Sequence, residues 1–206
     1  MMTIKLTNVG KRFNREWIFR HYNFEFTSAK SYAITGPNGS GKSTLLQIIA
    51  GATLLSEGGI EYYNESKKIA PEDLYTYISI AAPYLELVEE MTLLEFLHFH
   101  SGLKNWLPSI TSQKIMSVAG LEAAAKKQIR YFSSGMKQRL KLVQAILSDV
   151  PIVLLDEPCT NLDEEGIILY KTLVKDHCRD RLFIISSNDV NEYDFCEEKI
   201  DMRNLK

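Results

Sequence analysis

The sequence predicts a mixed α/β fold: a mixed-sheet core with an antiparallel β part and a helical insertion. Three observations support this prediction. A glycine-rich turn at 36–41 lies between an apolar segment at 31–35, typical of a strand, and a helix-like segment at 45–50 that ends at Gly51. Continuous apolar runs at 152–155 and 182–185 are typical of strands buried on both faces. Residues 83–130 have mainly helical spacing.

The glycine-rich turn carries the strongest motif in the chain. It runs Gly36, Pro37, Asn38, Gly39, Ser40, Gly41, Lys42, Ser43 and Thr44, which has the form Gly-x-x-x-x-Gly-Lys-Ser. Glycines let the backbone approach an anion closely, and successive N–H groups then line a concave nest that the positive end of the next helix also faces. The motif and its strand–turn–helix context predict a P-loop NTPase fold.

Two side chains of this motif have separate predicted roles. Lys42 adds a positive charge for the outer phosphates, and Ser43 offers a hydroxyl to Mg²⁺, which prefers oxygen ligands. The alternative is a glycine-rich connection that binds nothing. The flanking strand and helix and the lysine disfavour that alternative.

The bulk composition limits the function classes. The 206 residues fit one domain with an insertion, and 45% hydrophobic with 24% charged residues is ordinary for a soluble globular protein. A net charge of −2 gives no reason to expect nucleic acid as a partner.

Three widely spaced cysteines favour incidental thiols in a reducing cytosol. The N-terminus lacks the apolar core of a signal peptide, and no apolar run approaches the roughly 20 residues that span a bilayer. Work at a membrane would therefore need a partner.

The first part of the chain predicts two strands and a turn. Residues 3–9 alternate as in an edge or half-buried strand, and 17–19 with 22–26 resemble a second strand with an interruption. Phe13 lies between them. Its ring can stack on an adenine, a contact worth roughly 1 kcal/mol, or it can cap the core, and the sequence position favours neither interpretation.

The middle of the chain predicts a turn at Gly58-Gly59 and strands at 60–63 and 74–80. A helix over 91–100 has Thr92 as its N-cap and Glu95 in a capping box. A second helix is predicted at 109–119, ended by Gly120. We therefore expect a single domain in which about 1–82 and 131–206 form an α/β lobe and about 83–130 form the helical insertion.

The last part predicts helices at 133–147 and 164–178, a short helix at 189–195 and a polar tail. The buried strand at 152–155 ends in Asp156 and Glu157, at the sheet edge where open α/β sheets bind ligands. Because adjacent strand residues point in opposite directions, the two carboxylates can have separate jobs. Asp156 can hold Mg²⁺ beside Ser43, and Glu157 can activate the water that attacks the γ-phosphate. The alternative for the pair is a turn or a helix N-cap.

Three segments together resemble one family, the ATP-binding subunits of ATP-binding-cassette (ABC) transporters. They are the phosphate loop at 36–44, the Leu154–Pro158 run, and Phe132–Leu140, which is similar to the family signature Leu-Ser-Gly-Gly-Gln. The resemblance extends from Phe13 to Asn188, with the segments in the family's order and spacing. It implies the ABC-ATPase type of P-loop NTPase fold, ATP and Mg²⁺ as ligands, and ATP hydrolysis.

The signature segment has a physical interpretation as well. Ser133 is a good N-cap, and Gly135 keeps the following N–H groups accessible, so the helix start can bind an anion. The resemblance implies a head-to-tail dimer. In it, Ser133, Ser134, Gly135 and Met136 of one subunit contact the ATP held by Lys42 of the other, and the loop Asn161–Asp163 runs along the interface. The alternative for Ser133–Gly135 is an ordinary capped helix.

Several positions depart from the family pattern. A glutamine that normally contacts Mg²⁺ and the attacking water is absent, and Ala82 or Pro83 stands there. Asn188 replaces a histidine that contacts the γ-phosphate, and its amide can donate a hydrogen bond but cannot carry a charge. Within the signature, Ser134 replaces a glycine and Met136 a glutamine. We therefore expect ATP binding to persist and hydrolysis to be slow, with Glu157, Lys42 and Asn188 as the catalytic residues.

The resemblance also implies partners. The expected function is the ATPase subunit of a transporter, cytoplasmic and held on the inner face of the membrane by an integral membrane subunit. A second copy of the chain is the expected dimer partner. The membrane subunit is expected to dock near residues 82–100, where Tyr84–Val88 offer apolar side chains. The chain resembles small bacterial exporter subunits, including those linked to haem or cofactor export. The alternatives are a non-transport ABC-type assembly ATPase and a regulatory subunit.

Overall fold

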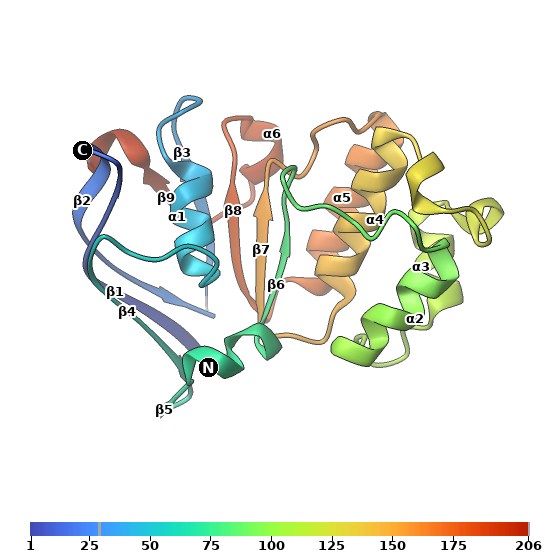
Figure 1. Ribbon diagram of the computed structural model, residues 1–206, viewed down its shortest axis with the longest axis horizontal. Coiled ribbons are helices and arrows are strands. Elements are labelled where there is room, and N and C mark those ends of the chain that lie inside the picture. Colours follow the sequence, from blue (N-terminus) through green and yellow to red (C-terminus); the bar gives the residue numbers. More distant parts are fainter. Residues whose placement is uncertain (29, 206) are drawn as a thin grey trace. The chain divides into compact units, whose positions relative to one another are not determined.

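The computed structural model describes residues 1–28 and 30–205. They form two compact units, which we describe separately. The first contains Met1–Ile80, Val150–Glu157 and Arg179–Lys206, and the second contains Ala81–Asp149 and Pro158–Cys178. Each unit therefore combines segments that are distant in the sequence, as the colours in Figure 1 show.

The first unit contains an antiparallel sheet in the order β2-β1-β4-β5. Its strands are β1 (Met2–Phe13), β2 (Glu16–Thr27), β4 (Glu57–Asn64) and β5 (Lys67–Lys68). β1 pairs with β2 on one side and with β4 on the other. The expected half-burial of β1 is confirmed, but its assignment as an edge strand was wrong, because β4 covers its second edge.

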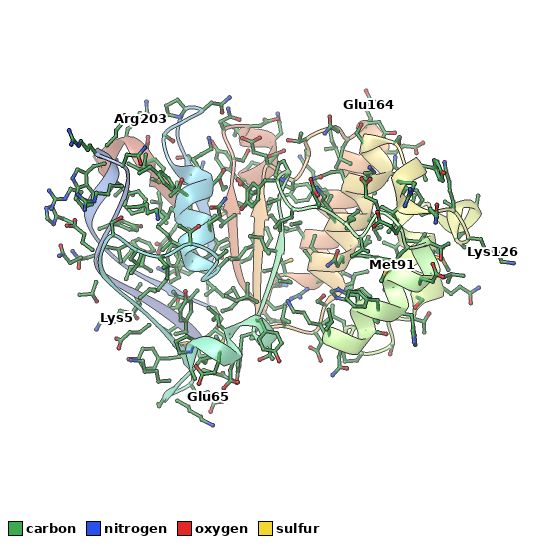
Figure 2. The ribbon with its side chains drawn as sticks, in the orientation of Figure 1. Lys5, Glu65, Met91, Lys126, Glu164 and Arg203 are labelled. Atoms are coloured by element: carbon green, nitrogen blue, oxygen red, sulfur yellow. The ribbon has the colours of Figure 1, made fainter. Side chains whose placement is uncertain are left out.

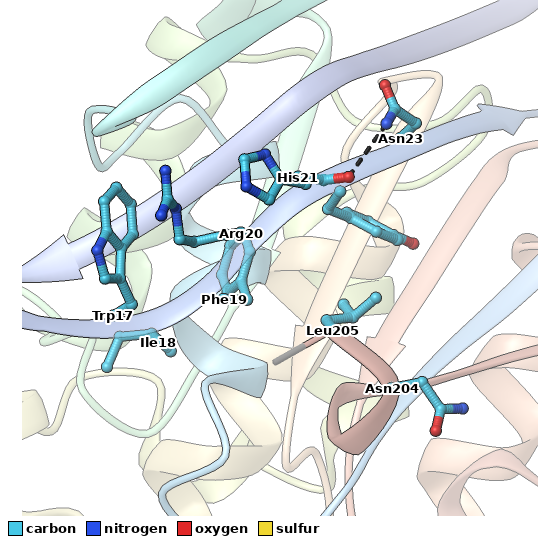
Figure 3. Close-up of a pocket in the computed structure, with 9 residues that line it drawn as sticks. Trp17, Ile18, Phe19, Arg20, His21, Asn23, Asn204 and Leu205 are labelled. Atoms are coloured by element: carbon cyan, nitrogen blue, oxygen red, sulfur yellow. Dashed lines mark hydrogen bonds between the residues drawn. The ribbon is translucent and has the colours of Figure 1, made fainter.

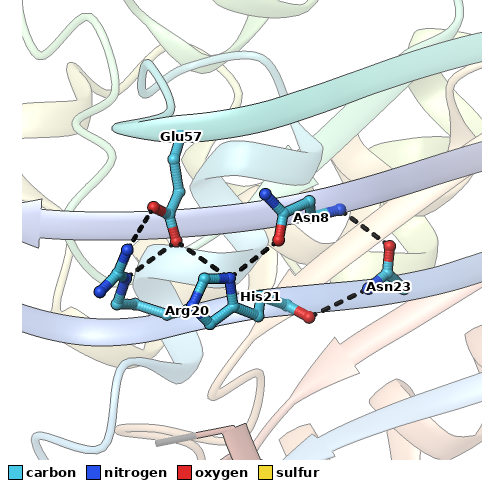
Figure 4. A network of polar contacts seen from close by, with 5 residues as sticks. All are labelled: Asn8, Arg20, His21, Asn23 and Glu57. Atoms are coloured by element: carbon cyan, nitrogen blue, oxygen red, sulfur yellow. Dashed lines mark hydrogen bonds and ion pairs between the residues drawn. The ribbon is translucent and has the colours of Figure 1, made fainter.

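The predicted interruption of the second strand corresponds to a local irregularity in a continuous β2. Asn8 and His21 have positive φ angles of 50° and 57°, and the β1–β2 register shifts beside them. Polar side chains stabilise this irregularity (Figure 4): His21 Nδ1 donates to Asn8 Oδ1 at 2.9 Å, and Asn8 N donates to Asn23 Oδ1 at 2.8 Å. Arg20 forms a bidentate ion pair with Glu57 of β4 at 3.0 and 2.8 Å, so the network also joins β2 to β4.

Gly58 and Gly59 lie inside β4, so the predicted turn was wrong. Gly58 has a φ of 81°, and a Cβ at this position would lie 2.1 Å from the backbone oxygen of Asn8. The glycine is needed where β4 approaches β1 closely, at the register shift between Thr7 and Gly10.

The second sheet has the order β6-β7-β8-β3-β9. Its strands are β6 (Ile78–Ala81), β7 (Ile152–Asp156), β8 (Leu182–Ser186), β3 (Ser31–Thr35) and β9 (Glu198–Asp201). β7, β8, β3 and β9 pair in parallel. Every residue of β7 and β8 is buried, which confirms the interpretation of the two apolar runs.

Two predictions about this sheet need correction. A 3-10 helix at Pro71–Thr76 replaces the first half of the strand predicted at 74–80, because Pro71 starts a helical turn that buries Leu74. The tail is not merely polar: β9 is the edge strand beside β3, and Met202 after it is fully buried. Its polar residues alternate with Ile200, and so short an alternation is a weak signal.

The core of the first unit lies around α1 (Lys42–Ile49). Figure 1 shows α1 between the antiparallel sheet and the parallel sheet. Leu45, Leu46, Ile48 and Ile49 pack in one cluster with side chains from both sheets. This packing fixes the start of α1, and with it the phosphate loop, against the carboxyl end of β3.

The second unit is helical: α2 (Leu93–Leu103), α3 (Ser112–Ala119), α4 (Ser134–Leu147) and α5 (Glu164–His177). The capping box of Thr92 and Glu95 is confirmed. α3 begins later than predicted, because Thr111 is its N-cap and Ser109 has a φ of 67°. Asp163 is the N-cap of α5, and Glu164 follows in the first turn, where an acidic residue favours the helix (Figure 2).

The short helix predicted at 189–195 is present in the first unit as α6 (Val190–Tyr193), with Asp189 as its N-cap. Within residues 1–28 and 30–205, none of the helices has the length and apolar character required to cross a bilayer.

Candidate functional site

The phosphate loop has the backbone that its motif predicts. Gly36, Gly39 and Gly41 have φ angles of 139°, 77° and 101°, which other residues rarely adopt. Gly41 is also restricted by packing, since a Cβ there would lie 2.3 Å from Ile18 of β2. The loop follows β3 directly and leads into α1 at Lys42, so its N–H groups and the helix N-terminus are available to one anion.

Lys42 lies inside this loop, with only 5% of its surface exposed. Its Nζ donates hydrogen bonds to the backbone oxygens of Gly36, at 3.0 Å, and Pro37, at 3.4 Å. These contacts hold an ammonium at the concave side of the loop. A buried cation that neutral backbone oxygens hold in this place is well suited to bind phosphate oxygens.

Asp156 provides a buried carboxylate at the end of β7, with 1% exposure. Burial raises the pKa of this carboxyl group, and the hydroxyls of Ser43 and Ser186 act in the opposite direction. Among the described residues, Oδ1 of Asp156 and the hydroxyls of Ser40 and Ser186 are buried polar groups without a hydrogen-bond partner. These hard oxygen donors fit Mg²⁺ better than any softer metal.

Glu157 is arranged differently from the predicted strand alternation. It lies just beyond β7, has a φ of 44° and is partly exposed, and its N–H donates to Ser186 O at 2.8 Å. The two neighbouring carboxylates lie in different environments because the backbone of Glu157 is left-handed, and not because adjacent strand residues alternate between two faces. A non-glycine residue in this conformation is strained and requires surrounding support. One carboxylate is thus buried and the other accessible.

Asn188 contacts the phosphate loop directly. Its Nδ2 donates to Oδ1 of Asn38 at 3.0 Å, and both side chains are exposed. The backbone N–H of Ser187 donates to Ile34 O at 3.1 Å, which holds the loop after β8 beside β3. The sequence placed Asn188 in the site but not its pairing with Asn38, since 150 residues separate the two.

Phe13 is half exposed at the end of β1, which disfavours the alternative that it caps the core. The Nζ of Lys11 lies 4.8 Å from the ring centroid and donates to Leu54 O at 2.8 Å. One face of the ring therefore carries a cation. A flat, half-exposed aromatic ring of this kind is available for stacking.

The signature residues lie in the second unit at the start of α4. Ser133 Oγ accepts from Met136 N at 3.2 Å, as expected of an N-cap. The helix start borders a hollow of about 290 Å³. Its lining comprises Gly120, Leu121, Ser133, Ser134, Gly135, Met136, Arg139, Asn161 and Asp163.

Arg139 adds a cation to this hollow that the sequence analysis did not assign. Its Nη2 pairs with Asp163 Oδ1 at 2.6 Å, and this contact, followed by the Gly166 N–H, lowers the pKa of Asp163. Asp163, predicted for an interface loop, thus caps α5 and binds Arg139 within one chain. The N–H groups at the start of α4 and the guanidinium together favour an anionic ligand.

The segment 82–91 lies against α4 in the same unit. Lys141 Nζ donates to the backbone oxygens of Ala82 and Pro83, each at 3.2 Å. Lys137 pairs with Glu89. The sequence analysis assigned no role to either lysine, because no local sequence pattern identifies a lysine whose partner is distant in the chain.

A larger hollow, of about 730 Å³, lies along β2 in the first unit (Figure 3). Trp17, Arg20 and His21 line one part of it, and Asn204 and Leu205 line another. It contains none of the predicted site residues. Ile18 belongs to its wall and also packs on Gly41, so we interpret this region as support for the phosphate loop.

The fold and the phosphate loop define the class of protein, a P-loop NTPase. A sequence model of the family described as ABC transporter matches residues 19–160. The chain belongs to the ABC transporter family, in which it is the ATP-binding subunit and an ATPase.

Relatives with curated names agree with this assignment. The chain is 36% identical, over 155 residues, to the cytochrome c biogenesis ATP-binding export protein CcmA of Xylella fastidiosa, covering 75% of this chain and 69% of that protein. It is 31% identical, over 176 residues, to ABC transporter I family member 1 of Arabidopsis thaliana, covering 84% and 75%.

Solved structures show the same fold. A putative ABC transporter ATP-binding protein from Pyrococcus furiosus matches with a TM-score of 0.80 and 18% identity, covering 99% of both chains. A dimeric ATP-binding cassette in a post-hydrolysis state, bound to ADP and Pi, matches with a TM-score of 0.79 and 24% identity, covering 96% of this chain and 93% of that one. The predicted ABC-ATPase fold is confirmed.

Proposed function

We propose that the chain binds Mg-ATP at its phosphate loop, hydrolyses it slowly in a head-to-tail dimer of two copies, and thereby drives a separate membrane-embedded transporter subunit. One arrangement carries this proposal. Lys42 is buried inside a loop whose glycines have positive φ angles, and the buried carboxylate of Asp156 lies near Ser43. We treat the chain as a single ABC ATPase domain, with a lobe at about 1–82 and 131–206 and a helical insertion at about 83–130.

Binding uses the phosphate loop from Gly36 to Thr44. Its N–H groups and Lys42 would hold the phosphates, and Phe13 would stack on the adenine with the ring face opposite Lys11. Ser43 and Asp156 would hold Mg²⁺, which neutralises phosphate charge when bound. Loss of Lys42 would remove the only buried ammonium that contacts this loop among the described residues.

Hydrolysis requires a base and a γ-phosphate contact. Glu157 is the better base of the two carboxylates, because it is accessible and Asp156 is buried. Asn188 would donate a hydrogen bond from its amide but cannot supply positive charge. With Ala82 and Pro83 in place of a glutamine, the water also lacks one positioning contact. Loss of one such contact costs about a hundredfold in rate, which is why we propose slow turnover.

The second contact to ATP would come from the other copy. The hollow at the start of α4 combines the N-terminus of the helix with Arg139, and Ser133, Ser134, Gly135 and Met136 line it. In the proposed dimer this hollow faces the γ-phosphate bound by Lys42 of the partner copy. ATP then joins the copies, and hydrolysis releases them by removing the charge that both hold.

The partner of this dimer would be an integral membrane subunit, since the named relatives include ATP-binding export proteins. We propose that it docks at Tyr84–Val88, where Tyr84, Leu85 and Val88 are 44%, 36% and 39% exposed. The chain would then lie on the cytoplasmic face of the membrane. By analogy with the named relatives, we propose an exporter as the working complex.

The test is steady-state ATP hydrolysis by the purified chain with Mg²⁺, beside Glu157→Gln and Lys42→Ala. We expect slow turnover that falls about a hundredfold or more in Glu157→Gln, with ATP binding retained. Lys42→Ala should lose ATP binding. Glu164→Gln, an exposed acidic residue of α5, serves as the matched control and should not change the rate.

Two results would contradict the proposal. Equal rates in the parent and in Glu157→Gln would remove the assigned base. ATP binding without turnover, in the parent and in the presence of membranes that contain the partner, would favour a regulatory subunit.

A further inference from the structure

Helix α4 connects the proposed ATP-binding hollow at its N-terminus with two lysines on the same face of the helix. Ser133, its N-cap, lies at the hollow proposed to receive ATP from a second copy. Lys137 and Lys141 follow at intervals of four residues, so all three project from nearly the same face. Residues 133 and 141 are about 12 Å apart along a helix. Buried side chains hold the helix in place: Leu140, Leu142, Val143, Ile146 and Leu147.

Lys141 holds the beginning of segment 82–91. Its Nζ binds the backbone oxygens of Ala82 and Pro83, at 3.2 Å each. Burial lowers the pKa of this lysine, while Glu86 acts in the opposite direction. A partly buried ammonium group needs such hydrogen-bond acceptors. Breaking this contact would therefore cost free energy, because it would leave the lysine and the two backbone oxygens without their partners.

Other contacts hold the end of the same segment. Lys137 pairs with Glu89, whose backbone oxygen accepts from Arg130 N at 3.0 Å. Gln128 Nε2 donates to Glu90 O at 3.0 Å. Ile129 N also donates to Met91 O at 2.9 Å, and Arg130 pairs with Glu90 at 3.4 Å. Segment 82–91 is therefore attached both to α4, through Lys137 and Lys141, and to the chain just before α4, through residues 128–130.

The exposed apolar side chains lie between these attachments. Tyr84, Leu85 and Val88 belong to the middle of the segment, which is the proposed docking surface for the membrane subunit. A force that the membrane subunit applies to these side chains would act on the contacts of Lys137 and Lys141. Because Lys137, Lys141 and Gly135 belong to one continuous helix that Ser133 caps, a displacement of either lysine would also be felt at the start of that helix.

We propose that Lys137 and Lys141 are positioning residues that couple the docking segment 82–91 to the signature hollow at the start of α4. In this chain they would replace the missing glutamine as the connection between partner and nucleotide. The inference rests on the proposed function, because it takes the dimer and the docking surface from it. Coupling of this kind is reciprocal: ATP bound at the hollow must also stabilise the segment.

The experiment uses the full chain with Glu157→Gln, so that ATP is held, and compares it with Lys137→Met/Lys141→Met in the same background. Methionine keeps the aliphatic stem and the helix propensity and removes only the charge. Lys141→Arg is the conservative variant, and Lys171→Met, an exposed lysine of α5, is the matched control. Thermal unfolding checks that each variant is folded.

Hydrogen exchange of residues 82–91 and 133–137 is measured with and without Mg-ATP, together with the affinity for ATP and the mass in solution. In the double variant we expect faster exchange in both segments without nucleotide, and no protection of 82–91 by ATP. We expect dimerisation to weaken about tenfold, within the usual range of coupling, while the monomer binds ATP unchanged. Lys141→Arg and Lys171→Met should behave as the parent.

Two outcomes would overturn the linkage. One is faster exchange at 82–91 with no change at 133–137, which would make the lysines a local structural support. The other is unchanged exchange in both segments. A parent that fails to bind ATP or to dimerise would instead contradict the proposed function. Exchange at 133–137 in the absence of nucleotide would still decide the linkage.

Discussion

Asn188 and Asn38 form an amide pair at the phosphate loop. An amide donates a hydrogen bond to phosphate but cannot carry the charge that an imidazolium supplies. The residue therefore suits ATP binding better than it suits rapid hydrolysis. The missing positive charge at this position is one reason why we propose slow turnover.

Asn188→His should accelerate ATP hydrolysis by about tenfold, if charge at this position contributes roughly 1.4 kcal/mol to the transition state. The gain should be present at low pH and fall as pH rises through the histidine pKa, near 6.5, because only the protonated ring is charged. The measurement is the pH–rate profile of parent and variant. Asn204→His, at an exposed asparagine outside the site, is the control.

An unchanged rate, or a gain that does not depend on pH, would show that the charge of this side chain does not limit turnover. A parent as fast as typical transporter ATPases would contradict the slow-turnover proposal itself.

The sequence predicted site residues wherever the chemistry is local. The glycines, Lys42 and Ser43 are adjacent in the chain, so their spacing alone indicates a phosphate site. It did not predict the roles of Lys11, Arg139, Lys137 or Lys141. Each of these cations contacts a group that is distant in the sequence, and only the tertiary fold brings the two together.

At the scale of elements, α2 combines a polar N-terminus with a buried histidine near its end. His100 is 6% exposed, stacks on Trp106 with 4.3 Å between ring centroids, and lies 2.8 Å from Ser148 Oγ. Ser148 Oγ donates to Gln144 O, so Nε2 of His100 is the donor in their shared bond. This places a neutral imidazole between α2 and the end of α4.

The stability of the protein should therefore depend on pH through His100. Burial, and then the charge of Lys104, lower the pKa of His100 to about 4 from 6.5 in an unfolded chain. Between these values the unfolded chain binds more protons than the folded one, so stability is full above pH 6.5 and is lost as pH falls toward 4. The loss is up to about 3 kcal/mol.

Urea unfolding from pH 4 to 7 measures this dependence. We expect His100→Gln to be less stable at pH 7 but to lose much less stability on acidification. His98→Gln, at an exposed position of the same helix, should keep the full pH dependence of the parent. Equal slopes for the parent and His100→Gln would assign the acid sensitivity to other groups.

Elements were predictable where pattern and capping agreed. The buried β7 and β8 are short apolar runs, and α2 has both a helical period and a capping box. The failures were at β4, where Gly58 is required by close approach of Asn8, and at β9, where a single buried Ile200 gives little period. Both depend on neighbouring strands, which a local pattern does not contain.

At the scale of the whole molecule, the functional residues divide between the two units. Lys42, Asp156, Glu157 and Asn188 belong to the first, and the signature hollow with Arg139 belongs to the second. We propose one anion site in each unit. Two anion sites on one chain are the physical basis for proposing that one ATP is shared by two copies.

The most direct test of this account is the mass of the Glu157→Gln variant in solution, measured by sedimentation with and without Mg-ATP. We predict a monomer without nucleotide and a dimer with Mg-ATP. Adding Gly135→Asp, which places a negative charge in the signature hollow, should leave ATP binding intact and abolish the dimer. A variant that binds ATP and remains monomeric at high protein concentration, or a dimer that is indifferent to Gly135→Asp, would contradict the shared-ATP mechanism.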